Sequence, residues 1–349
     1  MRPKFTLAEG LSGNVRIPAS AKDQRQLLDH RVCPKRSGID TFGCSTRSRR
    51  LAALDLGSGV GHLSTYEALR VEVMQAEECR HPTTEIIAEM ARTIRPVEGR
   101  VVLTDYSGEY PDASDHNALF AHLQLDPETR ARVMTFNIRR ADKEVPGHTW
   151  LSRRHRVAKL IADWQPSVVA VQECDSTMYG YLLRKLRELT GVEWAMVRHP
   201  NVGILYKVGR WEQLAVRKLD MDNSNETDRR IVLVLLRSKA TGAEVWFGST
   251  QLSTLWPWWR RYQARKVVAL LRTLPNNGIQ RSVVMGDLND YAQHDSTSVR
   301  QVFAEAGFYE LRVRLSEAQM TGDRARTHHQ FDLLTPRDSR QIDVVFTPR

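Results

Sequence analysis

The stretch Ser114-Asp115-His116, followed by Asn117-Ala-Leu-Phe-Ala-His-Leu-Gln-Leu125, decides how this chain folds. A short polar motif that runs into an apolar segment is typical of a strand beginning beside a functional loop. A second strand, Val133-Met-Thr-Phe-Asn137-Ile-Arg, begins eight residues after Leu125. The residues between them are few and polar, so they predict a turn that joins two neighbouring antiparallel strands.

Outward from this pair, predicted strands outnumber predicted helices. We expect strands at 100–105, 117–125, 131–138, 167–173, 193–198, 202–207, 211–219, 230–238, 244–251, 282–286 and 341–347. We expect helices at 150–164, 177–190, 257–274 and 297–306. Several strands are joined by short turns, which argues against a doubly wound parallel sheet. The pattern predicts an α/β (α+β) chain that forms a four-layer α/β/β/α sandwich, with two mixed β-sheets flanked by helices.

The N-terminal part of the chain differs in composition from the rest. Residues 1–50 carry eleven Lys/Arg and four Asp/Glu without a regular apolar period, so we expect a basic, mostly irregular arm. Residues 51–97 predict a small helical extension with helices at 64–81 and 83–95, the second ended by Pro96. The sandwich would then occupy 98–349.

Composition bounds the partners and the compartment. The chain has 349 residues, 41% hydrophobic content and a net charge of +10, which favours phosphate-bearing partners, although a basic arm can also be a solvated tail. Its four cysteines fit neither a metal knuckle nor a disulfide framework, so we expect reduced thiols. No apolar run is long enough for a membrane span and no signal peptide is evident, so we expect a cytoplasmic protein without a membrane partner.

Five short polar segments lie where predicted strands meet loops. They are Thr135-Phe-Asn137, Val171-Gln172-Glu173, Gly286-Asp287-Leu-Asn289, Gln341-Ile342-Asp343 and Ser114-Asp115-His116. Each segment alone is more typical of a surface pair, a turn or a capped loop. Together they supply hard oxygen ligands for Mg²⁺, amides that can hold a phosphate oxygen, and a histidine with a second carboxylate to orient it.

This set resembles the exonuclease–endonuclease–phosphatase superfamily, which has the DNase I-like fold, over residues 99–349. The family pattern runs from an Asn after the first strand through Gln-Glu, a His-Leu strand end, Gly-Asp-x-Asn and Ile-Asp to a final Ser-Asp-His. The resemblance implies a metal-dependent phosphodiesterase that hydrolyses nucleic acid, DNA rather than RNA. Its cofactor would be Mg²⁺, with Mn²⁺ as the alternative ion.

The resemblance also implies roles for the metal ligands and the groups around the attacking water. Glu173 would ligate the metal with Asp115 nearby. Asp287 would orient or deprotonate the water. Asn289 and Asn137 would hold phosphate oxygens as charge develops.

The last motif is in the wrong place for this family, because Ser-Asp-His precedes the first strand. His116 would contact the scissile phosphate or act as a general acid–base, and Asp343 would fix its tautomer, so the two must meet in space. A circular permutation, with 99–125 placed first, would complete one site. A decayed upstream copy predicts a second Gln-Glu or Gly-Asp-x-Asn before residue 99, and the sequence has none. The third alternative is strand swapping between molecules.

Five further residues are candidates for substrate binding: Gln251, Trp258, Arg260, Arg261 and His329. Gln251 stands where many members have His, and an amide can bind phosphate but cannot transfer a proton. The Trp-rich segment at 256–261 would stack bases and grip phosphate, or else pack a helix start against the sandwich. Thr327-His328-His329-Gln-Phe331 resembles a Thr-Phe-His-Gly-Phe segment of some members.

Two other functions compete with a nuclease. The same chemistry could act on a small phosphoester such as an inositol phosphate or a phospholipid head group. Ser339-Arg340-Gln341 stands where inositol 5-phosphatase-like members carry Trp-x-Asp-Arg, which weighs against that substrate. A non-catalytic structural protein could also retain the fold, and the acidic positions present here weigh against it.

Overall fold

The computed structural model describes residues 94–104, 110–143, 145–221, 226–290, 298–321, 327–329 and 341–349. The basic arm expected at 1–50, the helix expected at 64–81 and all but the last two residues of the helix expected at 83–95 lie outside the described residues. The chain divides into two units, and every described residue belongs to the second, Gly61–Arg349.

One sheet has seven strands, in the order β12-β1-β2-β3-β4-β6-β5. Their bounds are β12 (Met320–Thr321), β1 (Arg95–Val102), β2 (Ala118–Gln124), β3 (Arg130–Asn137), β4 (Val168–Cys174), β6 (Asn201–Lys207) and β5 (Trp194–His199). β2 pairs antiparallel with both β1 and β3. β3 and β4 are parallel and are joined through helix α3 (Trp150–Trp164). The segment that opens with Ser114 therefore runs alongside the strand that ends at Asn137, as the sequence predicts.

The other sheet has six strands, in the order β11-β13-β10-β9-β8-β7. Their bounds are β11 (Phe308–Glu310), β13 (Asp343–Pro348), β10 (Ser282–Asp287), β9 (Glu244–Gln251), β8 (Arg230–Ser238) and β7 (Trp211–Asp220). β9 and β10 are parallel and are joined through α5 (Pro257–Arg272). Both sheets are mixed, so parallel strands of each place their carboxyl ends at one edge.

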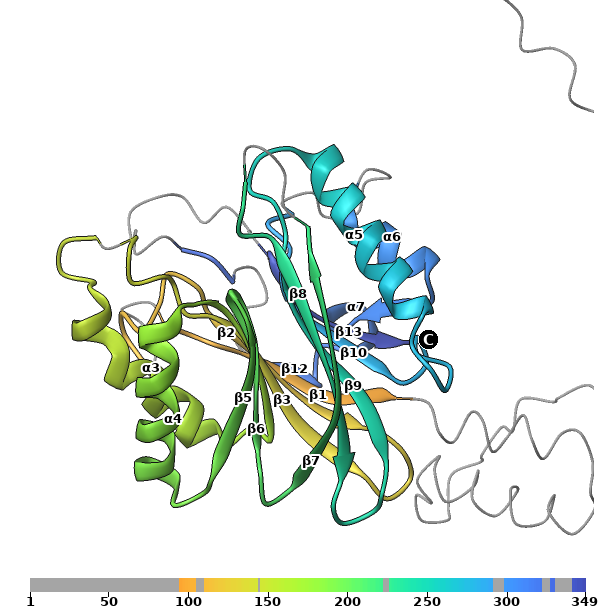
Figure 1. Cartoon of the computed structure of the whole chain (residues 1–349), viewed down its shortest axis with the longest axis horizontal. Helices are drawn as coiled ribbons and strands as arrows, with labels where there is room; N and C mark the ends of the chain where they lie inside the picture. Colours follow the sequence, from red (N-terminus) through yellow and green to blue (C-terminus); the bar gives the residue numbers. More distant parts are fainter. Residues whose placement is uncertain are drawn as a thin grey trace, which may run out of the picture. The chain divides into compact units, whose positions relative to one another are not determined.

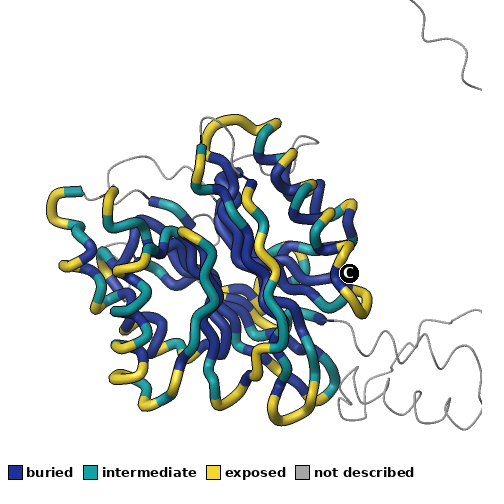
Figure 2. Tube along the Cα trace, viewed as in Figure 1, coloured by how far each residue is buried: buried dark blue, intermediate teal, exposed yellow. Residues whose placement is uncertain are grey.

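The layers stack as helix, sheet, sheet, helix (Figure 1). Helices α3 and α4 (Ser176–Thr190) cover the seven-stranded sheet, and their apolar faces share one core cluster with it. Helices α5 and α6 (Val299–Glu305) cover the six-stranded sheet through a second cluster. A third cluster, with Val133 and Val283 among its members, fills the space between the sheets. The central strands are buried, whereas the edge strands β5 and β7 are largely intermediate or exposed (Figure 2). The four-layer sandwich predicted from the sequence is confirmed.

Three details differ from the sequence prediction. Arg95 and Pro96, expected at the end of a helix, begin strand β1, where the pairing with β2 shifts between Pro96 and Glu98. The hydrogen-bond ladder between the strands is already interrupted at a bulge. Proline, which has no N–H, therefore costs no further hydrogen bond there. β11, β12 and the four-residue helix α7 (Leu311–Arg314) were not expected, since elements of two to four residues carry no measurable period. None of the described helices is long and apolar enough to cross a membrane.

Candidate active site

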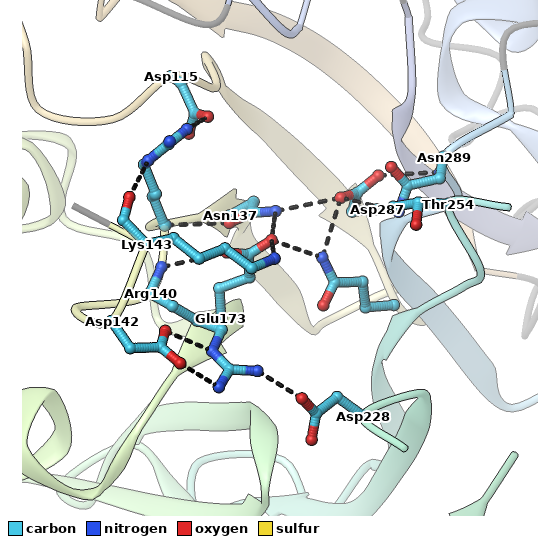
Figure 3. Close-up of polar contacts among 12 residues, drawn as sticks. Asp115, Asn137, Arg140, Asp142, Lys143, Glu173, Asp228, Thr254, Asp287 and Asn289 are labelled. Carbon is cyan, nitrogen blue, oxygen red and sulfur yellow. Dashed lines mark hydrogen bonds and ion pairs between the residues drawn. The ribbon is translucent and has the colours of Figure 1, made fainter. Parts of the chain in front are cut away.

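Four strand ends, two from each sheet, bring polar side chains together at one edge of the sandwich. They end β3 at Asn137, β4 next to Glu173, β9 at Gln251 and β10 at Asp287. Asn137 Nδ2 donates to Asp287 Oδ2 at 3.1 Å and to Glu173 Oε1 at 3.3 Å (Figure 3). Gln251 Nε2 donates to the same two oxygens, at 3.3 Å and 2.9 Å. Two amides thus bridge two carboxylates from opposite sheets.

Glu173 is held in an unusual backbone conformation. Its φ of 60° lies in the left-handed region, which costs a non-glycine residue about 1 kcal/mol or more. Its Oε2 accepts from the Arg140 backbone N–H at 3.1 Å, and Lys143 Nζ lies 3.9 Å from Oε1. Burial alone would raise the pKa of this carboxyl, but the Lys143 charge and the hydrogen bonds from Gln251 and Arg140 lower it to about 2. Glu173 is therefore ionised at neutral pH.

Asp287 depends on the glycine before it. Gly286 has φ 155°, and a Cβ there would lie 2.0 Å from the Thr250 carbonyl oxygen, so no larger residue allows β10 to approach β9 so closely. The Asp287 carboxylate accepts from the Asn289 backbone N–H at 2.9 Å. Burial raises the pKa of Asp287 to about 6, with further contributions from the Asp343 and Glu173 charges and an opposing one from His116.

Asn289 follows Asp287 in a left-handed turn, with φ 49°. Its Nδ2 donates to the Leu252 carbonyl at 3.0 Å and lies 3.4 Å from Asp287 Oδ2. The turn therefore carries its amide side chain back over the carboxylate instead of into solvent.

The predicted meeting of His116 and Asp343 is confirmed. His116 Nδ1 lies 2.9 Å from Asp343 Oδ2, although 227 positions separate the two residues. Because Nδ1 donates to this carboxylate, Nε2 is the ring nitrogen that stays able to hydrogen-bond a substrate. Burial would lower the pKa of His116, but the charge of Asp343 and its hydrogen bond, together with Asp287 and Asp115, raise it to about 10.

The rest of the displaced motif anchors itself to the end of β3. Ser114 Oγ donates to the Asn137 carbonyl at 2.7 Å. Asp115 forms an ion pair with Arg139, the second residue after Asn137. Residues 114–116 and the Asn137 strand end thus form one local unit.

A family model for the Endonuclease/Exonuclease/phosphatase family matches residues 134–341, which is more than half of the chain. The chain belongs to this family. The matched range begins inside β3 and includes Glu173 and Asp287, and the Ser114-Asp115-His116 motif lies before it. Hydrolysis of a phosphoester is the class of activity that membership in the family supports.

Solved structures of the family resemble the chain at low sequence identity. An endonuclease/exonuclease/phosphatase from Bacteroides vulgatus is 20% identical, with a TM-score of 0.48 over 63% of this chain and 88% of that one. A mannosyl-6-phosphatase from Bacteroides thetaiotaomicron is 17% identical, with a TM-score of 0.47 over 62% and 84%. The human Nocturnin catalytic domain with bound sulfate is 18% identical, with a TM-score of 0.47 over 63% and 83%. The chain finds no match among curated protein sequences.

The family generally uses a divalent metal, and the donor set at this edge fits one. The carboxylates of Asp287 and Asp343 lie within 4.8 Å of the buried His116 imidazole, and that of Glu173 is joined to Asp287 through two amides. Asp343 Oδ1 is buried and has no hydrogen-bond partner in the described part of the chain. An excess of buried carboxylate oxygen is the environment that Mg²⁺ and similar hard cations prefer.

The sequence predicts that Glu173 and Asp115 share a metal ion, but no group of three possible ligands in the described residues contains both. Within the described ranges, the groups whose ligand atoms lie within 4.8 Å of one another are Asp115–His116–His328 and His116–Asp287–Asp343. Glu173 belongs to neither group, and Asp115 already pairs with Arg139.

The substrate-binding candidates divide into two groups. Gln251 lies inside the site, and Trp258 is 62% exposed at the start of α5, next to the partly buried Arg261. Arg260 is a correction, because it is only 5% exposed and its Nη1 donates to the Ser253 carbonyl at 3.3 Å. It supports a loop, and the helical spacing of the buried Arg260, Ala264, Val267 and Leu271 is a signal that predicts this.

His329 is also buried, with Nε2 3.0 Å from Thr104 Oγ1. Its neighbour His328 is the residue whose ring lies 4.5 Å from the ring of His116, between centroids. The sequence does not predict the place of His328, because a His-His pair on an irregular segment does not indicate which ring turns inward. Nor does it predict a place at the site for Arg139, Arg140 and Lys143, whose signal is their position directly after Asn137.

Proposed function

We propose that this chain is a metal-dependent phosphodiesterase that hydrolyses nucleic acid, with DNA as its main substrate. The observation that carries the proposal is the contact between His116 and Asp343, 2.9 Å apart, beside the amide-bridged carboxylates Glu173 and Asp287. Phosphodiester hydrolysis needs a positioned water, donors for the phosphate oxygens and compensation of the developing charge. The residues at this edge can supply each of these.

Asp287 is the candidate that orients and deprotonates the attacking water. Its pKa near 6 makes it a stronger base than an ordinary aspartate and still ionised at neutral pH. The Asn289 N–H and the side-chain amides of Asn137 and Gln251 donate hydrogen bonds that fix the Asp287 carboxylate. The same groups would donate to phosphate oxygens when substrate is bound. These amides would stabilise charge as it develops in the transition state.

His116 is the candidate that donates to a phosphate oxygen. Its raised pKa keeps the ring protonated at neutral pH, so it would act as an electrostatic partner or general acid. Asp343 holds Nδ1 and thereby fixes the ring orientation.

Glu173 is the candidate ligand for the divalent cation, because its carboxylate stays ionised and lies at the strand ends. When bound there, the cation would neutralise phosphate charge and stabilise the leaving oxygen. Mg²⁺ is the ion we expect, with Mn²⁺ as a substitute.

Nucleic acid is favoured as substrate by charge. The chain carries a net charge of +10, and Arg139, Arg140 and Lys143 follow the Asn137 strand end at the rim of the site. Cations around a hydrolytic site attract a polyanion more strongly than a small monoester.

The test compares plasmid DNA, single-stranded DNA, RNA, an inositol phosphate and a phosphoinositide, each with Mg²⁺ or with EDTA. We expect cleavage of DNA in Mg²⁺, none in EDTA, and none by Asp287→Asn. Glu188→Gln, at a surface ion pair on α4, is the matched control and should cleave as the wild type does. Cleavage of the small phosphoesters with intact nucleic acid would reject the proposal in favour of a phosphatase, and no cleavage at all would reject an enzyme.

A further inference from the structure

A group of large apolar side chains is exposed where the chain enters α5. Leu255, Trp256, Trp258 and Tyr262 are 43%, 44%, 62% and 42% exposed, and Figure 2 shows this end of the helix as exposed. They are four of eight exposed large hydrophobic residues in the described part of the chain, and they include each aromatic residue among the eight. We call this group the α5 platform. A clustered apolar surface of this kind marks a binding site, whereas single exposed residues need no explanation.

Two rings of the platform lie nearly parallel to each other. Trp256 and Trp258 have an interplanar angle of 12° at 5.9 Å between centroids. Behind them, Trp259 and Tyr262 stack at 4.7 Å with an angle of 24°. The two pairs are turned relative to each other, because the rings of Trp258 and Trp259 meet at an interplanar angle of 74°. The parallel, exposed rings of Trp256 and Trp258 are the geometry on which other flat rings can stack.

The helix beneath the platform is strongly basic. Its sixteen residues include five Arg or Lys and no Asp or Glu. Lys266 Nζ lies 5.2 Å above the Tyr262 ring, and Arg265 is exposed one position before it. Aromatic faces interleaved with cations complement a ligand that has both flat rings and phosphates.

Hydrogen bonds through Leu252 and Ser253 link helix α5, which carries the platform, to the active site. Leu252 accepts from Asn289 Nδ2 at 3.0 Å, and its N–H donates to the Asp287 carbonyl at 3.0 Å. The next residue, Ser253, donates from its N–H to Gln263 Oε1 of α5 at 2.8 Å and accepts from Arg260. Two residues therefore fix the start of α5 to the turn that carries Asp287.

We infer that the α5 platform stacks the unpaired bases of a nucleic acid strand whose backbone crosses the active site, and that it selects single-stranded over duplex substrate. The inference rests on the proposed function, since it names the form of nucleic acid that the same site takes. In a duplex the base faces are already stacked on one another, so its outer surface offers the platform no ring to bind. A single strand exposes those faces at no cost.

A membrane surface is the rival occupant, because Trp and Arg also bind lipid headgroups. The composition of the platform favours bases: Leu255 is its one aliphatic member, and aliphatic chains are what enters the acyl region of a bilayer.

The test measures binding of the full chain in EDTA, so that no hydrolysis occurs. Fluorescence anisotropy follows a fluorescein-labelled 20-mer of thymidylate and a labelled 20-base-pair duplex. We expect tighter binding of the single strand by the wild type, and about 10-fold weaker single-strand binding for Trp258→Ala with less than about a 2-fold change for the duplex. Trp258→Phe keeps a ring face and should restore most of the affinity.

Two controls keep the result specific. Leu151→Ala removes a residue that is 69% exposed on α3 and should bind both DNA forms as the wild type does. Trp256→Ala repeats the test at the neighbouring ring, and thermal melting shows that each variant folds.

The inference is overturned if Trp258→Ala weakens single-strand and duplex binding equally, or if it weakens neither. It is also overturned if the variant instead loses binding to vesicles of phosphatidylcholine and phosphatidylserine. Hydrolysis of bis(p-nitrophenyl) phosphate by the wild type is measured in parallel. Absence of that hydrolysis, and of any cleavage of nucleic acid, would reject the proposed function, while the binding result in EDTA would still decide the role of the platform.

Discussion

Two clusters of buried charge lie close together in this molecule and are built in opposite ways. At the strand ends, the carboxylates of Asp287 and Asp343 lie within 4.8 Å of the buried His116 imidazole, and two amides bridge Asp287 to Glu173. These residues come from strands far apart in the chain. The second cluster, which we call the ion network, is Arg300, Glu310 and Arg312, all within thirteen positions. Arg300 Nε lies 2.7 Å from Glu310 Oε2, and Arg312 Nη1 lies 3.0 Å from Glu310 Oε1.

The difference distinguishes a reactive site from a cluster of charges that stabilises the fold. In the ion network, burial would raise the pKa of Glu310, but the two arginines and their hydrogen bonds lower it, so the acid gains from its surroundings. At the strand ends, burial and like charges raise the pKa of Asp287. Asp287, which its surroundings destabilise when ionised, is poised to take a proton, whereas Glu310, which two arginines compensate, stabilises the fold. Arg312 also donates to the Asp343 carbonyl at 2.9 Å, so the support holds a strand of the site.

The largest effect is expected from Asp287→Asn. An amide cannot accept the proton of the attacking water, so we expect cleavage to fall by about 10³-fold or more. Asp287→Asn should raise the stability of the fold at neutral pH, although it lowers activity. The raised pKa means that the folded protein binds a proton that the unfolded chain does not, so wild-type stability falls as pH rises through about 6. Thermal melts between about pH 4, near the ordinary aspartate pKa, and about pH 6 should show this slope in the wild type and a smaller slope in the variant. An active variant, or one that loses stability at pH 8, would contradict this description of the site.

A somewhat smaller loss is expected at the His116–Asp343 pair. His116→Ala and Asp343→Asn should each lower kcat by about 10²- to 10⁴-fold, because one removes the donor and the other its orientation. Since the residues act as a unit, the double variant should lose little more than the worse single one. Additive losses would mean that the 2.9 Å contact does not couple them.

Substitution in the ion network should lower the free energy of unfolding. Glu310→Gln removes the buried counter-charge of Arg312 and leaves Arg300 with Asp290, 3.6 Å away. We expect the free energy of unfolding to fall by about 3–5 kcal/mol. Glu188→Gln breaks the exposed pair with Lys185 and should cost less than about 1 kcal/mol. Urea denaturation at pH 7 measures both. Equal costs would remove the distinction between buried and exposed pairs on which the comparison depends.

The pH dependence of the network has the opposite sign to that of Asp287. The folded pKa of Glu310 is lowered, so its contribution is fully present above the ordinary glutamate pKa of about 4.3 and is lost as pH falls below it. Glu310→Gln should therefore reduce the acid-side loss of stability. An unchanged acid limb would show that the network contributes nothing there.

The sequence predicts the sandwich and the main acids of the site, because strand periodicity and strand-end position are local signals. Gly286 before Asp287 and Gln172 before Glu173 are examples, and the structure brings them to one edge. The side-chain environment is not local. Arg260 turns inward and Trp258 outward on one helix, and His328 instead of His329 packs against His116. The sequence predicts a strand at 100–105 but not the first residues of β1 (Arg95–Val102), because Pro96 is typical of a helix end and its place in the strand depends on a bulge opposite β2.

The smallest effect is expected from reordering the chain, because the site is assembled by strand position and not by sequence order. Arg314 Nη1 donates to the Ile94 carbonyl at 3.4 Å and to the Pro348 carbonyl at 2.8 Å, so the start of β1 and the end of β13 meet at one guanidinium. A chain that runs from Arg130 to Arg349 and continues through a short Gly-Ser linker into 94–125 would restore the usual family order. We expect its melting temperature and nuclease activity to match those of the unpermuted 94–349 control, with a loss of about 1 kcal/mol from opening the β2–β3 turn. If the reordered chain fails to fold while the control folds, the order of the strands is itself needed, and reading 99–125 as a displaced last strand is wrong.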